Sequence, residues 1–338
     1  MKKVVFTVAD YGKGNDAGPK AKRDVDYYLS QSGFEVIHQQ LNNKSKLDKI
    51  KTAYWVIPRL FNDVEKFDEL FFQYPTYSSY VMKRLINKMR SKSKKLFFII
   101  HDVESLRLFQ NDQNYWDSER ALFNATDGLI VHNHKMKRWL QENGVTVPMV
   151  ELGIFDYNNP QKINQNSEYD RTICFAGNLA KSKFLDKISL QAGKLEIFGS
   201  YPSEYYLKGV SYHGQMSPDE LPKKLTQNFG LVWDGDQLDT CSGKFGNYMR
   251  YNNPHKVSLY LSSGQPVIIW KEAALADFIL KNNLGIAVNS LENLDDILED
   301  ITEKQYSELK MNTIEIAKKL RKGDFIKSAV KKIENITE

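Results

Sequence analysis

A polar cluster in the second half of the chain combines residue types that suit the binding of a diphosphate. An apolar segment follows it, which Gly264 ends, and Pro266 precedes the apolar run Val267–Trp270. Proline in a first turn and glycine just after a last turn mark helix boundaries. The first N–H groups of a helix bind anions, and a lysine there adds charge. We therefore expect a diphosphate at this helix start, whose residues are Asn252, Asn253, Pro254, His255 and Lys256.

Two further loops of the second half follow predicted strands. Gly177, Asn178 and Lys181 come after the strand Thr172–Phe175. Glycine lets a ligand approach the backbone, an asparagine amide can bond it, and lysine can meet a phosphate. The alternative is a helix cap with solvated lysines. Tyr212 ends another predicted strand and could stack on a uracil, although ordinary packing explains a tyrosine there equally well.

An acidic loop follows the predicted strand Phe229–Trp233. Asp234, Asp236 and Asp239 partly match a calcium-binding loop, but the later glutamate of such a loop is missing. We expect a mobile loop in which Asp234 and Asp236 face a sugar, and we expect no metal ion.

In the first half, a strong apolar strand, Leu96–Ile100, ends in His101 and Asp102. Ligands of open α/β sheets bind beyond the carboxyl ends of the strands. An imidazole or carboxylate there could take a proton from an acceptor hydroxyl. The alternative is that both residues cap structure or bind the acceptor.

The elements that position these loops alternate between strands and helices in both halves. Near-continuous apolar strands separated by helices indicate parallel sheets covered on both faces. We predict two facing Rossmann-like domains with a cleft between them. The expected divisions are an acceptor-side domain over 1–156, a linker over 157–170, a nucleotide-sugar domain over 171–320 and a C-terminal helix over 321–338. Within the first half, Ala53–Ile57 is expected to be a strand, followed by a long polar and aromatic loop.

Composition narrows the class of protein. The 338 residues are 41% hydrophobic and 26% charged, as in a globular protein that is not embedded in a membrane. No apolar run approaches the roughly 20 residues that span a bilayer, and the N-terminus lacks the features of a signal peptide. Two cysteines argue against a disulfide framework. The net charge is +5, but the sequence lacks the dense basic face of a nucleic-acid binder. We expect a cytoplasmic protein that binds no nucleic acid.

The loops, in this order, resemble GT-B glycosyltransferases. Phe175-Ala176-Gly177-Asn178-Leu179 with Lys181, Tyr212-His213-Gly214, and Tyr251 with the 252–256 cluster are similar to one bacterial family. That family is nucleotide-sugar-synthetase-like or galactofuranosyltransferase-like. It includes the streptococcal glucosyltransferase that adds the second sugar to serine-rich-repeat adhesins. The resemblance covers essentially the whole chain.

The resemblance implies UDP-glucose as donor, an O-linked N-acetylglucosamine acceptor on a Ser/Thr-rich protein, no metal, and a homo-oligomer, either tetramer or dimer. It places the UDP contacts on the first glycine loop, at Asn15, Ala17 and Gly18, and on the loops described above, including Tyr251. Two rival hypotheses stay open. One is a hexosyl- or galactofuranosyltransferase that builds capsule or exopolysaccharide on a lipid-linked acceptor, and the other is a non-catalytic GT-B partner subunit.

Overall fold

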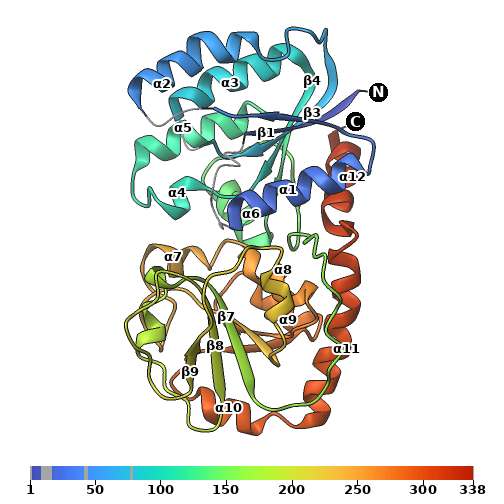
Figure 1. The fold of residues 1–338 in the computed structure, drawn as a ribbon. Helices are drawn as coiled ribbons and strands as arrows, with labels where there is room; N and C mark the ends of the chain where they lie inside the picture. The colour runs from blue at the N-terminus through green and yellow to red at the C-terminus, as the bar shows by residue number, and fades with distance from the viewer. Residues whose placement is uncertain (1, 9–16, 42–44, 77–78, 338) are drawn as a thin grey trace. The chain divides into compact units, whose positions relative to one another are not determined.

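The computed structural model describes residues 2–8, 17–41, 45–76 and 79–337, which form two compact units (Figure 1). The first unit comprises Met1–Gly153 and Phe325–Glu338, and the second comprises Ile154–Asp324. The last helix, α12 (Asp324–Thr337), thus belongs almost entirely to the first unit. There the Lys3 ammonium pairs with the Glu334 carboxylate at 2.8 Å. The end of the chain therefore completes the unit in which the chain begins.

The first unit is built on a six-stranded parallel sheet with the order β2-β1-β3-β4-β5-β6. Buried apolar residues dominate its inner strands because helices cover both faces, as expected for a parallel sheet. In Figure 1, α3 and α5 lie together over the sheet, and α12 lies beside α1. The strands are β1 (Lys3–Val8), β2 (Glu35–Gln39), β3 (Phe67–Tyr74), β4 (Ser93–Ile100), β5 (Gly128–Val131) and β6 (Met149–Glu151).

The helices of the first unit connect these strands in the way that a parallel sheet requires. The described α-helices are α1 (Ala17–Ser30), α2 (Lys46–Lys51), α3 (Ser79–Lys92), α4 (Glu104–Arg107), α5 (Gln113–Asn124), α6 (His134–Glu142) and α12. Asp112 and Asn133 cap the starts of α5 and α6 with their side chains.

The prediction of a strand over Ala53–Ile57 is wrong. Residues 52–56 form a π-helical turn that continues α2, and Phe67–Tyr74 is a buried strand between β1 and β4. Aromatic and β-branched residues favour strands only where they are buried, whereas Tyr54 and Trp55 are exposed here. The long polar and aromatic loop that we expected after Ile57 is therefore partly sheet, and Phe71 and Phe72 are fully buried in the core.

The second unit contains another six-stranded parallel sheet, with the order β12-β11-β10-β7-β8-β9. From β7 the chain first adds β8 and β9 on one side, and later adds β10, β11 and β12 on the other. The carboxyl ends of β7 and β10 are therefore the topological switch point, where open α/β sheets bind ligands. The strands are β7 (Thr172–Asn178), β8 (Lys194–Ser200), β9 (Val210–Tyr212), β10 (Phe229–Val232), β11 (Val267–Trp270) and β12 (Gly285–Val288).

Helices complete the second unit, and α11 packs against α8. The described α-helices are α7 (Gly243–Tyr248), α8 (His255–Ser262), α9 (Ala276–Lys281), α10 (Leu294–Asp300) and α11 (Glu303–Leu320). The predicted helix start at the polar cluster is α8, and the predicted strand after Pro266 is β11. Among the described residues, no helix has both the length and the apolarity to cross a bilayer.

Candidate functional site

Three sequence-predicted residues meet at the switch point of the second unit. Gly177 lies near the end of β7, Asp234 follows β10, and Lys256 lies in the first turn of α8. The Lys256 ammonium is 3.0 Å from Asp234 Oδ1 and 3.3 Å from the Trp233 carbonyl oxygen. It also lies 4.5 Å from the centre of the Phe175 ring. The structure thus holds one cation at the edge where this sheet type binds ligands.

The position of α8 depends on a close packing contact. The Tyr260 ring lies against Gly230 in β10, where any β-carbon would overlap the ring. The Tyr260 hydroxyl accepts a hydrogen bond of 2.7 Å from the backbone N–H of Ala176 in β7. One tyrosine therefore joins α8 to both strands of the switch point, and glycine at 230 makes room for it.

The start of α8 has the features of an anion site. Pro254 is its N-cap residue, and no side chain caps the helix in the part of the chain that the structure describes. The helix dipole and the first N–H groups favour a negative charge at such an end. Asn178 is the last residue of β7, and Asn252 precedes α8 by three residues. The side-chain oxygen Oδ1 of each is buried and has no hydrogen-bond partner among the described residues.

Other members of the polar cluster point elsewhere. The His255 ring packs 5.0 Å from the Tyr157 ring and 6.1 Å from the Phe155 ring, measured between centroids. Asn253 is buried, and Tyr251 is half-buried, with its backbone N–H bonded to the Tyr248 carbonyl at 2.9 Å. These residues shape the turn that leads into α8.

The remaining predicted residues of the second unit are more exposed. The Lys181 ammonium lies 4.5 Å from the centre of the Phe245 ring, in contact with α7. Tyr212, at the end of the edge strand β9, donates its hydroxyl to the Gly199 carbonyl at 3.0 Å and is 41% exposed. Asp236 is exposed, whereas Asp234 is engaged by Lys256. The two acids that we expected to face a sugar thus have different surroundings.

In the first unit, His101 and Asp102 follow β4 as predicted, and they have different partners. His101 Nε2 is 2.7 Å from Gln73 Oε1 in β3. The Asp102 carboxylate forms an ion pair with the Arg107 guanidinium of α4. His101 is therefore the better placed of the two to exchange a proton, because the Asp102 carboxylate already serves a cation.

A buried acidic pair lies directly behind these residues. Glu119 accepts hydrogen bonds from the Tyr74 hydroxyl at 2.7 Å and from the backbone N–H groups of Glu104 and Ser105 at 2.9 and 3.0 Å. Burial raises the pKa of Glu119. Burial also raises the pKa of Glu104 to about 7, against the opposing effect of Arg107. Through its bonds to the Glu104 and Ser105 N–H groups, Glu119 fixes the segment that follows His101 and Asp102.

Sequence reasoning missed Gln73 and Asp26, which connect this loop to α1. Gln73 is fully buried, and its amide nitrogen is 2.7 Å from Asp26 Oδ1. A glutamine within the apolar strand Phe67–Tyr74 is the signal that could have found it, once that segment is recognised as a strand. Buried polar side chains need partners, so they indicate networks.

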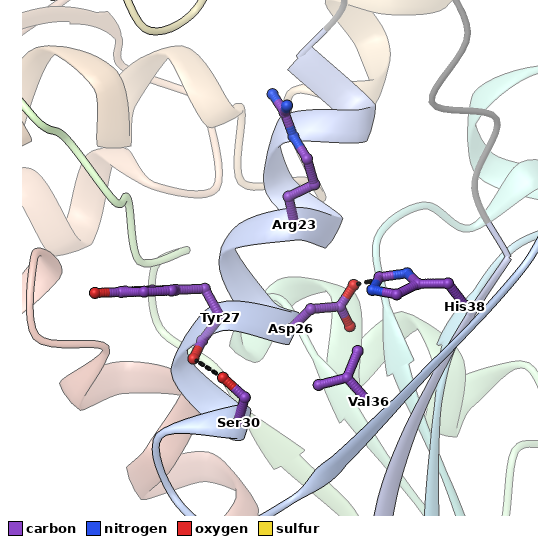
Figure 2. Close-up of a pocket in the computed structure, with 6 residues that line it drawn as sticks. All are labelled: Arg23, Asp26, Tyr27, Ser30, Val36 and His38. Atoms are coloured by element: carbon purple, nitrogen blue, oxygen red, sulfur yellow. Dashed lines mark hydrogen bonds and ion pairs between the residues drawn. The ribbon is translucent and has the colours of Figure 1, made fainter.

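A pocket of about 340 Å³ lies between α1 and β2, and Asp26 of the same network is one of its lining residues. Figure 2 shows Asp26 directed at His38, while Arg23 and Tyr27 extend away from that pair. His38 Nδ1 lies 3.6 Å from Asp26 Oδ2, and burial lowers the pKa of His38. The six lining residues are Arg23, Asp26, Tyr27, Ser30, Val36 and His38.

Only some of the residues predicted to bind UDP in the first glycine loop belong to the part of the chain that the structure describes. Asn15 lies outside the described residues. Ala17 and Gly18 are the first two residues of α1, which follows β1. Their backbone is thus at the start of a helix, where a phosphate can be bound.

Comparisons with known proteins agree on the class of protein. Residues 3–154 match the N-terminal domain model of the "Glucosyltransferase 3-like" family, and residues 173–333 match its C-terminal domain model. The chain is 30% identical over 327 residues to beta-1,6-galactofuranosyltransferase WbbI of Escherichia coli K12, with 92% of this chain and 96% of the relative covered. It is 27% identical over 266 residues to glucosyltransferase 3 of Streptococcus gordonii, with 78% of each chain covered.

Solved structures show the same fold at low sequence identity. A glycosyltransferase from Rickettsia africae has a TM-score of 0.62 at 10% identity, with 100% of this chain and 99% of that chain covered. A trehalose-6-phosphate synthase from Burkholderia multivorans has a TM-score of 0.58 at 11% identity, with 99% of each chain covered. The matched models, the identity to two sugar transferases and the two parallel sheets lead to one conclusion. The chain belongs to the Glucosyltransferase 3-like family and is a glycosyltransferase of the GT-B fold.

Proposed function

We propose that this glycosyltransferase moves glucose from UDP-glucose to an O-linked N-acetylglucosamine on a Ser/Thr-rich protein. The observation that carries the donor half of this proposal is the position of Lys256 in the first turn of α8, beside Gly177 at the switch point. A cation, a helix start and a glycine at that edge are the groups that a nucleoside diphosphate requires.

The ion pair between Lys256 and Asp234 suggests how the donor binds. A diphosphate carries more charge than one carboxylate, so it would attract the Lys256 ammonium away from Asp234 or share it. The ammonium and the α8 N-terminus would then stabilise the negative charge that grows on UDP as the sugar leaves. The buried amide oxygens of Asn178 and Asn252 could each accept a hydrogen bond from a ribose hydroxyl or the uracil N–H.

On the first unit, we assign the acceptor proton to His101. Its imidazole directly follows the central strand β4 and pairs with Gln73, whereas the Asp102 carboxylate pairs with Arg107. Taking the proton from the attacking hydroxyl as the bond to the sugar forms contributes roughly a hundredfold to ten-thousandfold to such reactions.

The identity of the sugar rests on the relatives. The glucose assignment follows the family description and the relative from Streptococcus gordonii. Galactofuranosyl transfer is the second candidate, because the Escherichia coli relative is more similar to this chain and matches more of it. We further expect a cytoplasmic protein, as the composition indicates, and a homo-oligomer, tetramer or dimer, that needs no metal ion, as the resemblance implies.

A panel of UDP-sugars tests this proposal. UDP release is followed with purified protein, with and without a Ser/Thr-rich peptide that bears N-acetylglucosamine. Release from UDP-glucose that rises with the glycopeptide is the expected result. Preference for UDP-galactofuranose would replace the glucose assignment with the second candidate. If no donor is turned over and UDP does not bind, the chain is a non-catalytic partner and the proposal is wrong.

A further inference from the structure

A buried hydrogen-bond network in the first unit fixes the orientation of the Gln73 side chain. Its Nε2 is 2.7 Å from Asp26 Oδ1, 3.1 Å from the Lys22 carbonyl oxygen and 2.7 Å from Thr7 Oγ1. A carboxylate and a carbonyl can only accept hydrogen bonds, so the donating end of the amide must face them. The accepting end, Oε1, therefore faces the opposite way.

Thr7 reinforces this orientation. Its hydroxyl donates to Asp26 Oδ1 at 2.6 Å, which leaves an oxygen lone pair to accept from Gln73. Gln73 is fully buried, so water cannot compensate for a reversed amide. Reversal would direct Oε1 at a carboxylate and a carbonyl, and it would leave buried polar atoms without a hydrogen bond, which is strongly unfavourable.

The consequence reaches His101. Gln73 Oε1 lies 2.7 Å from His101 Nε2, and a carbonyl oxygen can only accept. Nε2 must therefore carry a hydrogen. In a neutral imidazole one nitrogen is a donor and the other holds the lone pair, so the lone pair of His101 is on Nδ1.

We propose that Gln73 is a positioning residue that sets the tautomer of His101, with hydrogen on Nε2 and the basic lone pair on Nδ1. This inference rests on the proposed function, in which His101 takes the acceptor proton. Nδ1 would take the hydroxyl proton while the hydroxyl oxygen forms a bond to the anomeric carbon. The bond from that carbon to the diphosphate breaks, and UDP leaves with its electron pair.

The tautomer can be measured without any substrate. Long-range proton–nitrogen correlation spectra distinguish a protonated ring nitrogen from an unprotonated one, and the His101→Gln variant assigns the signals. At about pH 8.5, well above the usual histidine pKa of about 6.5, we expect the Nε2–H tautomer in the wild-type protein. The Nδ1–H tautomer, or an equal mixture of both, would overturn the proposal, whatever the protein's activity.

Two variants separate the amide from the rest of the network. Gln73→Met removes the acceptor, and we expect His101 to become a mixture of tautomers and turnover to fall at least about tenfold. Thr7→Val disturbs the same network, but Asp26 and the Lys22 carbonyl still orient Gln73, so the tautomer should persist. An unchanged His101 tautomer in folded Gln73→Met would refute the positioning role. If that variant fails to fold, the wild-type spectrum and Thr7→Val still decide the matter.

Failure of the proposed function looks different. If His101→Gln retains full turnover while the wild-type spectrum shows the Nε2–H tautomer, the base assignment is wrong and the tautomer inference stands. A tenfold loss of turnover in Gln73→Met, with an unchanged Michaelis constant for the donor, would show that the His101 tautomer matters for the proton transfer.

Discussion

The Lys256 ammonium lies 3.0 Å from the Asp234 carboxylate, at the carboxyl edge of the second sheet. Both side chains are mostly buried, with exposed fractions of 16% and 24%. Removing one partner would leave the other poorly compensated, so the pair couples the acidic loop after β10 to the start of α8. A bound diphosphate would act directly on this pair.

Lys256→Met should weaken UDP binding roughly tenfold to a hundredfold, the loss that corresponds to one charge-assisted hydrogen bond. Calorimetric titration with UDP measures the change. Lys187→Met is the matched control, because Lys187 is an exposed lysine of the same unit that bonds to Gln237. Equal UDP affinity in the wild type and in folded Lys256→Met would exclude Lys256 as a diphosphate ligand.

Asp234→Asn should strengthen UDP binding a few-fold. The variant keeps the shape of the side chain but removes the charge that competes for Lys256. The same titration measures it, with Asp236→Asn as the control because Asp236 is exposed. Unaltered UDP affinity combined with a large loss of turnover would instead assign Asp234 to the donor sugar.

His101→Gln should lower turnover by roughly a hundredfold or more, with UDP affinity within about twofold of the wild type. Asp102→Asn should lower turnover less, because the Asp102 carboxylate serves Arg107. Steady-state rates and UDP titrations on both variants test this order. A larger loss in Asp102→Asn would reverse our assignment of the two residues.

Gly230→Ala should destabilise the protein by about 1–3 kcal/mol, because the new methyl group overlaps the Tyr260 ring. Thermal unfolding measures the loss. Truncating the ring in Gly230→Ala/Tyr260→Ala removes the overlap, so the two changes should be less than additive. Strict additivity would mean that the contact does not position α8.

Lys310 gives a dependence of stability on pH. Its ammonium is buried beneath α8 and donates to the Gly264 carbonyl at 2.6 Å, and burial lowers its pKa to about 8. Between this value and the unfolded pKa of about 10.4 the unfolded chain binds more protons, so stability rises with pH. The free energy of unfolding of the wild type should therefore increase relative to that of Lys310→Met by up to about 3 kcal/mol between pH 7.5 and 10.5. A constant difference between their unfolding midpoints across this range would contradict the lowered pKa.

The sheet of the second unit was largely predictable because its strands are short continuous apolar runs. Val267–Trp270 is β11 with the predicted bounds, and the cluster before it does open a helix at His255. The sequence also predicts helices near Phe184–Leu190 and over Pro218–Thr226, but the structure has only short 3₁₀ turns there, Lys183–Asp186 and Leu221–Lys224. Pro222 lacks the backbone N–H that a longer helix through the second of these segments would use.

The relationships at the two sheet edges could not be predicted, because they join residues far apart in sequence. Lys256 and Asp234 are predicted from separate motifs, and no local pattern pairs them. Gln73 meets Thr7, Asp26 and His101 only when β1, α1, β3 and β4 are assembled. Local sequence indicates which residues could do chemistry, whereas strand order determines which of them meet.

The most direct test of the proposed function is the product itself. The N-acetylglucosamine-bearing peptide is incubated with UDP-glucose and enzyme and then analysed by mass spectrometry, with Lys256→Met in parallel. We predict that the peptide gains one hexosyl residue with the wild type, and far more slowly with the variant. A peptide that stays unmodified by an enzyme that binds UDP would contradict the proposed transfer of glucose to this acceptor.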